Sequence, residues 1–168
     1  MKTVLTLTLA PVLAICASAT QAQSAGPEAL KAAITYNIIR FVDFPQDSPA
    51  DPVQLCVARG AAASRELAAL GGQRIGNRAI QFRPVEPDGT AGCDVVYLGQ
   101  ASAGDIVKSR RRGAITVGEG PSFIGAGGTI GLVRTGNQVR FEVNLKASRD
   151  AGFSISSRLL RLAARIQQ

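Results

Sequence analysis

Two of the three cysteines, Cys56 and Cys93, lie in short apolar runs, and this constrains the fold more than any other feature of the 168-residue chain. Cys56 is inside residues 53–58, and Cys93 opens residues 93–98. Short runs that are rich in valine and leucine are typical of buried strands. A disulfide between the two thiols would hold these strands together. Disulfides form in oxidising compartments, so the compartment of the protein decides whether this bond is available to its fold.

The first two dozen residues have the features of a secretory signal. A lysine is followed by an apolar run over residues 4–15 and then by small residues, which is the order of such signals. The run is too short to span a bilayer, which needs about 20 residues. Cleavage fits after Ala22 or Ala19, and we favour Ala22. A lipoprotein signal, with the lipid on Cys16, fits less well because the preceding residue is not small.

Removal of residues 1–22 leaves a domain over residues 23–168 with two cysteines and a net charge of +6. Thiols of exported proteins meet an oxidising environment, so we predict a disulfide between Cys56 and Cys93. Two separate buried thiols are less expected there. The bond would leave no reactive thiol for catalysis.

Composition excludes several kinds of catalysis. The chain has no histidine, which excludes Ser–His and Cys–His nucleophiles and zinc-hydrolase sites. The carboxylates of Asp43, Glu119 and Glu142 are scattered in the sequence. We therefore expect no catalytic residues, no metal and no cofactor. An enzyme would need the fold to bring such groups together in a pocket.

The formal net charge of the whole chain is +7. Nucleic acid is not an expected partner, because the chain is exported and has too few aromatic residues for a stacking platform. The excess of arginine instead favours an acidic partner or an anionic membrane surface. The densest cluster, residues 110–112, is interpreted as the positive last turn of a helix over residues 103–112 rather than as an anion site.

Helices and strands alternate along the rest of the chain. The pattern predicts a single small α/β domain with a mixed β-sheet flanked by helices and stapled by one disulfide. The first helix has Pro27 in its first turn, carries an apolar stripe of Leu30, Ile34, Ile38 and Phe41, and ends before Pro45. Further helices are expected at 65–70 and 103–112, and strands at 53–58, 80–85, 94–98, 114–117, 129–134 and 138–143, the last two forming a hairpin.

The glycine-rich residues 118–128 do not form a phosphate-binding loop. Such a loop needs a helix directly after its glycines, whereas this one leads into a strand-like run. We predict a tight turn at Gly127 and Gly128 instead.

The final residues predict an amphipathic helix that starts near Ser154 or Ser156. Its apolar stripe would contain Ile155, Leu159, Leu162 and Ile166, and its opposite flank Arg158, Arg161 and Arg165. A solvated face is the simpler interpretation of these arginines. A basic ridge that docks an acidic partner is the alternative.

Six segments of the chain resemble the YfiR family, in the family's order and over almost the whole mature chain. The longest, KAAITYNIIRFVDFP at residues 31–45, resembles the family's opening helix. The others are LCV at 55–57, CDVVYL at 93–98, GGTI at 127–130, VRFEVN at 139–144 and ISSRLLRLA at 155–163. Two positions depart from the family pattern: Phe44 replaces a tryptophan and Asp94 replaces a histidine. The mature chain also lacks the cysteines for a second, C-terminal disulfide found in the family.

The resemblance implies a periplasmic protein with a mixed sheet and helices on its faces, often dimeric, so that a homodimer is one expected state. It places Cys56 and Cys93 as the family's bridge. It also implies partners. In this family the regulator binds an inner-membrane diguanylate cyclase and holds it inactive, and an outer-membrane lipoprotein sequesters the regulator and relieves the inhibition.

We therefore predict a non-enzymatic periplasmic regulator that inhibits or modulates a membrane-bound diguanylate cyclase or another membrane sensor. The predicted partner-binding residues are Phe41, Phe44, Arg158, Arg161 and Arg165. A small-ligand-binding module that serves a transporter or receptor is the alternative function.

Overall fold

A computed structural model describes residues 26–44, 51–111 and 113–168 of the chain. The predicted signal at residues 1–22 and its cleavage site lie outside the described residues. No helix in the described ranges is both long and apolar enough to cross a membrane.

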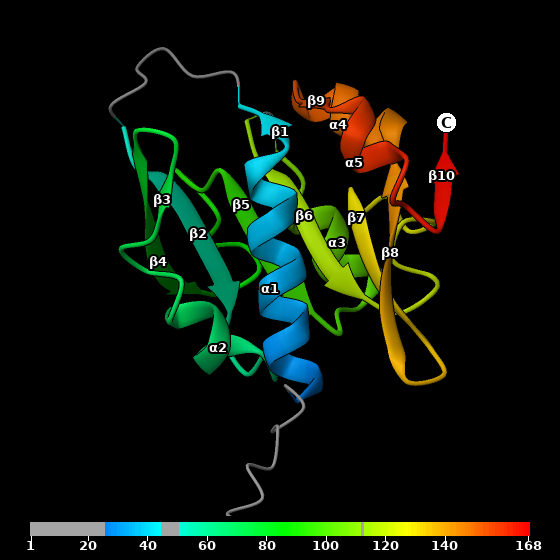
Figure 1. Cartoon of the computed structure of the whole chain (residues 1–168), viewed down its shortest axis with the longest axis horizontal. Coiled ribbons are helices and arrows are strands. Elements are labelled where there is room, and N and C mark those ends of the chain that lie inside the picture. Colours follow the sequence, from blue (N-terminus) through cyan, green and yellow to red (C-terminus); the bar gives the residue numbers. More distant parts are fainter. Residues whose placement is uncertain (1–25, 45–50, 112) are drawn as a thin grey trace, which may run out of the picture.

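The chain alternates between short helices and strands (Figure 1). The helices are α1 (Pro27–Arg40), α2 (Ser64–Ala68), α3 (Ala103–Ser109), α4 (Leu145–Ala151) and α5 (Ser157–Leu160). The strands are β1 (Val42–Asp43), β2 (Val53–Ala58), β3 (Arg74–Ile75), β4 (Arg78–Val85), β5 (Val95–Gly99), β6 (Ile115–Glu119), β7 (Ile130–Thr135), β8 (Gln138–Asn144), β9 (Ser154–Ile155) and β10 (Arg165–Gln167).

The main sheet has eight strands in the order β10-β8-β7-β6-β5-β2-β4-β3. Its central strands β7, β6, β5, β2 and β4 are parallel to their neighbours within this group, whereas β3 pairs antiparallel with β4, and β8 antiparallel with β7. The predicted mixed sheet is therefore confirmed. Pro84 has no amide hydrogen to donate. It is exposed and lies in the part of β4 that β3 does not pair with, so this part of β4 is an edge, where proline is tolerated.

Both faces of the sheet are covered, which explains why β2, β5 and β6 at its centre are mostly apolar and buried. Leu55 and Val57 face a core that includes α1 and α2, and Cys56 and Ala58 face a second core that includes α3. Figure 1 shows α1 lying across one face and α3 behind the sheet. The disulfide therefore belongs to the α3 side.

Helix α1 packs on the sheet through a face that differs in part from the predicted stripe. Of the stripe, Ile38 is buried, while the others are half-buried. The buried face instead consists of Ala32, Thr35, Ile38 and Ile39. Two of these side chains are small, so the helix backbone can approach the strands closely. Thr35 satisfies its hydroxyl within the helix, because its Oγ1 donates to the Lys31 carbonyl at 2.9 Å.

The hairpin of β7 and β8 is confirmed. The strands pair from Ile130 with Val143 to Thr135 with Gln138, and only Gly136 and Asn137 lie between the last pair. Gly136 has a φ of +60°, the left-handed conformation that two-residue hairpin turns require.

The turn predicted at the end of the glycine-rich segment is present, and it encloses an aromatic ring. The amide of Gly128 donates to the carbonyl of Phe123, and Gly127 has a φ of +98°. The Phe123 side chain is 1% exposed and fills the space inside the turns. The glycine-rich segment therefore has a structural role: its turns pack around the Phe123 ring.

The predicted C-terminal helix is wrong beyond its first turn. Ser156 caps α5 by accepting from the Leu159 amide, but the helix ends at Leu160 and the chain then forms β10. The cause is the edge of the sheet. The Ala164 amide donates to the Phe141 carbonyl at 2.8 Å, and Arg165 pairs in register with Glu142, so strand pairing replaces the last helical turns. Leu162 and Ile166, expected on the apolar stripe, are 60% and 42% exposed.

The helix predicted over residues 103–112 ends earlier, at Ser109. Arg110 has an extended backbone with a ψ of 122°, and Arg111 forms a bridge with Ala114. These two arginines therefore do not belong to the last helical turn, where Lys108 stands instead. Arg112 lies outside the described residues.

Candidate functional site

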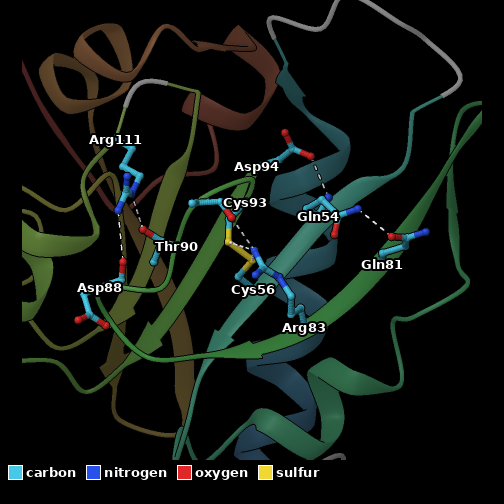
Figure 2. The surroundings of a disulfide bond; sticks show 10 residues. Gln54, Cys56, Gln81, Arg83, Asp88, Thr90, Cys93, Asp94 and Arg111 are labelled. Atoms are coloured by element: carbon cyan, nitrogen blue, oxygen red, sulfur yellow. Dashed lines mark hydrogen bonds between the residues drawn. A yellow bond between two sulfur atoms is a disulfide. The ribbon is translucent and has the colours of Figure 1, made fainter.

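The predicted disulfide is present and joins the two strands in the centre of the sheet (Figure 2). Cys56 of β2 and Cys93, just before β5, have Cα atoms 5.8 Å apart, and both residues are buried. Arg83 of β4 lies over the bond: its Nη2 is 3.4 Å from Cys56 Sγ and 3.2 Å from Cys93 Sγ, and it donates to the Ala91 carbonyl at 2.7 Å. Buried and oxidised, the pair has a structural role.

Asp94, one of the two departures from the family pattern, holds the start of β2. Its Oδ2 accepts from the Gln54 amide at 2.8 Å, as Figure 2 shows, and lies 3.6 Å from Arg78 Nη2. The other departure, Phe44, packs edge-on against Phe153 with ring centroids 5.5 Å apart. Both residues therefore stabilise local packing.

Phe41 and Phe44 lie at the end of α1, where three arginine side chains stack on aromatic rings. Strand β1 pairs with β9, which brings α5 next to the end of α1. Arg158 of α5 lies 5.9 Å from the Phe41 ring centroid. We call this surface the Arg–aromatic corner; it consists of Tyr36, Arg40, Phe41, Phe44, Arg78 and Arg158, with guanidinium-to-ring distances of 5.3 to 5.9 Å.

The structure brings only part of the predicted partner-binding set to this corner. Arg165 is on β10, where it forms two hydrogen bonds with the Glu142 carboxylate, at 2.7 and 3.0 Å. Arg161 is the exposed residue that directly follows α5. The three arginines do not share a helical flank, because the helix that would have aligned them ends at Leu160.

A second group of polar residues lies at the other end of α1, and sequence reasoning missed it. Lys31 of α1 donates to both oxygens of Glu28, at 3.0 and 3.1 Å, and to Glu119 Oε2 at the end of β6, at 2.8 Å. The fully buried Tyr97 of β5 donates its hydroxyl to Glu119 Oε1 at 2.7 Å. We call these four residues the acidic cluster. The one sequence signal was a tyrosine inside an otherwise aliphatic strand.

The acidic cluster shifts the protonation of its members. Burial, the Glu119 hydrogen bond and nearby negative charge all raise the pKa of Tyr97, which therefore stays protonated in the folded protein. Burial alone would lower the pKa of Lys31, but hydrogen bonds and charge from Glu119 and Glu28 outweigh it, so this pKa is raised. The lysine is thus held in its charged form.

Two adjoining cavities open on the acidic cluster. One has a volume of about 360 Å³ and extends towards the loop after β2, which includes Arg59 and Gly60. The other has a volume of about 310 Å³ and extends towards the β7–β8 hairpin. Glu28, Lys31, Gln100 and Glu119 line both. Among the described residues, no group of three or more potential metal ligands occurs.

Alkaline pH is expected to reveal the buried tyrosine. Because the pKa of Tyr97 is higher in the folded than in the unfolded protein, its hydroxyl contributes fully to the free energy of unfolding below the ordinary tyrosine pKa of about 10. That contribution is lost as the pH rises above this value. The stability difference between the wild type and Tyr97→Phe should therefore shrink between about pH 9 and pH 11. Urea unfolding at each pH measures it, and a difference that stays constant would contradict the assigned environment.

Comparison with known proteins gives one family match. The model of the YfiR/HmsC-like family matches residues 28–164, nearly the whole of the described chain. None of the curated proteins matches the chain.

Two solved structures are similar in shape. A conserved domain protein from Vibrio cholerae is 13% identical, with a TM-score of 0.56, over 84% of this chain and 60% of that one, so this likeness shows the fold alone. The present chain thus spans 60% of the length of that protein. An ABC domain from Streptococcus pneumonia, solved with L-Trp, is 8% identical over 67% of this chain and 54% of that one. Its TM-score of 0.46 is too low to carry an argument.

Proposed function

The chain belongs to the YfiR/HmsC-like family of periplasmic regulators in cyclic di-GMP signalling, and we propose that it acts there by binding an inner-membrane diguanylate cyclase and holding it inactive. The family match over residues 28–164 is the observation that carries this proposal. The action is binding alone: a regulator that binds the inactive state of the cyclase more tightly shifts the enzyme towards that state.

The Arg–aromatic corner is the surface that best fits such a partner. Arg40 and Arg158 are exposed, and each lies over the Phe41 ring, at 5.9 Å in both cases. Arginine and aromatic residues are enriched in protein interfaces and dominate their energetic centres. Guanidinium groups stacked on rings are held in place while their hydrogen-bond donors remain available for carboxylates. A periplasmic cyclase segment with acidic and apolar side chains would complement this corner.

The same surface gives a simple account of relief from inhibition. An outer-membrane lipoprotein that covers the Arg–aromatic corner would remove the regulator from the cyclase by competition. No conformational change in the regulator is required for this.

Deleting the gene tests the proposed function directly. We expect cyclic di-GMP to rise in the deletion strain and to return to its starting level when the gene is restored. Pull-down of solubilised inner membranes with the mature protein should recover a diguanylate cyclase. Unchanged cyclic di-GMP, with no cyclase recovered, would overturn the proposal, and recovery of a transporter subunit would favour the ligand-delivery alternative.

Replacing Arg158 with alanine should weaken cyclase binding by at least about tenfold, the range of an interface hot spot, while the free energy of unfolding changes by less than about 0.5 kcal/mol. Arg158→Lys should not restore binding, because an ammonium lacks the planar stacking group. Arg140→Ala, an exposed arginine on β8, is the matched control. Equal binding by the Arg158 and Arg140 variants, measured with the purified cyclase segment, would exclude the corner as the contact surface.

A further inference from the structure

Arg110 and Arg111 directly follow α3 but do not bond to the end of that helix. The Arg110 guanidinium forms no hydrogen bond with any described residue, and Oδ2 of Asp150 in α4 is 3.8 Å from its Nη2. Arg111 donates from Nε to Thr90 Oγ1 at 2.8 Å and from Nη2 to the Asp88 carbonyl at 3.2 Å (Figure 2). Neither guanidinium therefore bonds to a carbonyl of α3, and both acceptors of Arg111 are uncharged groups.

The two arginines line a cavity of about 260 Å³, together with residues of α3, α4 and the starts of β6 and β7. This volume is several times the roughly 30 Å³ that a water molecule occupies in the liquid, so a small solute fits. The lining includes three residues with small side chains, which leave the space open: Ala114, Ala147 and Ala151. A second cavity of about 210 Å³ shares four lining residues with the first, Arg110 and Asp150 among them, and adds Lys146. We call the two cavities the arginine pocket.

Both guanidinium groups are held in place by the protein itself. Arg110 lies against the backbone of the glycine-rich segment, since a Cβ atom at Gly127 would be 2.9 Å from its Nη1 and 3.4 Å from its Cζ. Glycine is thus the residue that leaves room for this guanidinium. Arg111 is fixed by its bonds to Thr90 and Asp88. Groups that are ordered before a ligand arrives lose less entropy when it binds.

The charge of the arginine pocket favours an anion. Its lining contains three cations, Arg110, Arg111 and Lys146, and one carboxylate, that of Asp150. Lys146 already donates to this carboxylate at 2.8 Å. That hydrogen bond and the charges of Lys146, Arg110 and Arg149 lower the pKa of Asp150. Cations therefore outnumber carboxylates by two among the lining residues, and an anion between the two guanidinium groups would relieve their mutual repulsion.

We propose that the arginine pocket binds a small solute through a carboxylate or phosphate group, which accepts hydrogen bonds from the guanidinium groups of Arg110 and Arg111. A planar guanidinium can donate two parallel bonds to two oxygens of such a group. The donors of Arg110 are all available for this, and Arg111 keeps those of Nη1. A short dicarboxylate would direct its second carboxylate towards Lys146 in the smaller cavity.

Calorimetric titration of the purified protein with succinate and, separately, with inorganic phosphate tests the proposal at constant, near-physiological ionic strength. We expect saturable binding that weakens by at least about tenfold in Arg110→Gln, through the loss of charge-assisted hydrogen bonds. This variant should fold like the wild type, because the Arg110 side chain forms no hydrogen bond within the described protein. Lys108→Gln is the matched control: it removes the same charge from the exposed face of α3, lines neither cavity and should bind like the wild type.

A second variant should change the affinity in the opposite direction. Asp150→Asn removes the carboxylate that competes with the solute for Arg110, so binding should tighten by about two- to fivefold, the size of an exposed ion-pair effect. A purely structural role of Asp150 would not produce tighter binding.

Three results would overturn the proposal: no saturable binding of either anion, equal affinities of Arg110→Gln and the wild type, or binding to phosphatidylglycerol vesicles without binding of the free anions. The last result would assign these arginines to a membrane surface. The titration needs no cyclase, so its failure is independent of any failure of the proposed regulatory function.

Discussion

Replacing Gly118 or Gly128 with alanine should destabilise the protein by about 3 kcal/mol or more, at the upper end of what overpacking of a core costs. Both glycines contact the Phe123 ring from opposite edges. A Cβ atom at Gly118 would lie 2.0 Å from Phe123 Cε2, and one at Gly128 would lie 2.1 Å from Cε1. No side-chain contact is that short, so the ring would have to leave its position.

The ring cannot move aside without large changes around it. Phe123 is 1% exposed and belongs to the core on the α3 face, together with Ile124 and Val96. Gly118 is inside β6, whose register with β5 and β7 fixes its backbone. A methyl group therefore meets a fixed strand on one side and a buried ring on the other.

Urea unfolding compares these variants with Gly104→Ala. Gly104 is exposed inside α3, and a Cβ atom there would meet only Ser102 Oγ, at 3.7 Å. Alanine in a helix should be neutral or stabilise by up to about 1 kcal/mol. Equal stability of the Gly118→Ala and Gly104→Ala variants would contradict the close packing of Gly118 against the Phe123 ring. Phe123→Leu combined with Gly118→Ala should recover part of the loss, because the smaller side chain leaves room for the methyl group.

Loss of the Cys56–Cys93 bond should lower the free energy of unfolding by about 4 kcal/mol. The two cysteines are 37 residues apart, and the chain-entropy model gives this value for a loop of that size. The loop contains α2, β3 and β4, so the bond constrains two of the eight strands of the main sheet. Cys56→Ala with Cys93→Ala is the cleanest change, since it leaves no buried thiol without a partner.

Urea unfolding with and without a reductant gives the measurement. The wild type should lose stability on reduction, and the double variant should be insensitive to the reductant and resemble the reduced wild type. An unchanged unfolding midpoint of the reduced wild type would contradict a stabilising role of the bond. Arg83, which lies 3.2 and 3.4 Å from the two sulfur atoms, shields the bond on one side. Arg83→Ala should therefore make reduction faster.

The strands were predictable where the sequence itself carries the constraint. Residues 53–58 form β2 within the predicted bounds, because a short run that is apolar except for Gln54 suits a strand covered on both faces. The hairpin turn at Gly136 was predictable for a similarly local reason. The bridge was predicted from two cysteines and an expected export signal; the bond is present, whereas the expected signal lies outside the described residues.

Features set by distant pairing could not be read in this way. The last residues have a helical apolar pattern, but residues 165–167 pair with the free edge of β8 as a strand. No local sequence pattern predicts that β8 has a free edge there. The acidic cluster joins Lys31 to Glu119, 88 positions later, and depends on how α1 lies on the sheet. The Arg–aromatic corner likewise requires β1 to pair with β9, two strands of two residues each.

Helix α1 carries residues of both the acidic cluster and the Arg–aromatic corner. Glu28 and Lys31 are near its first turn, and Arg40 is its last residue, about 14 to 18 Å away along the helix axis. A change that shifts this one helix on the sheet would therefore disturb both groups of residues together.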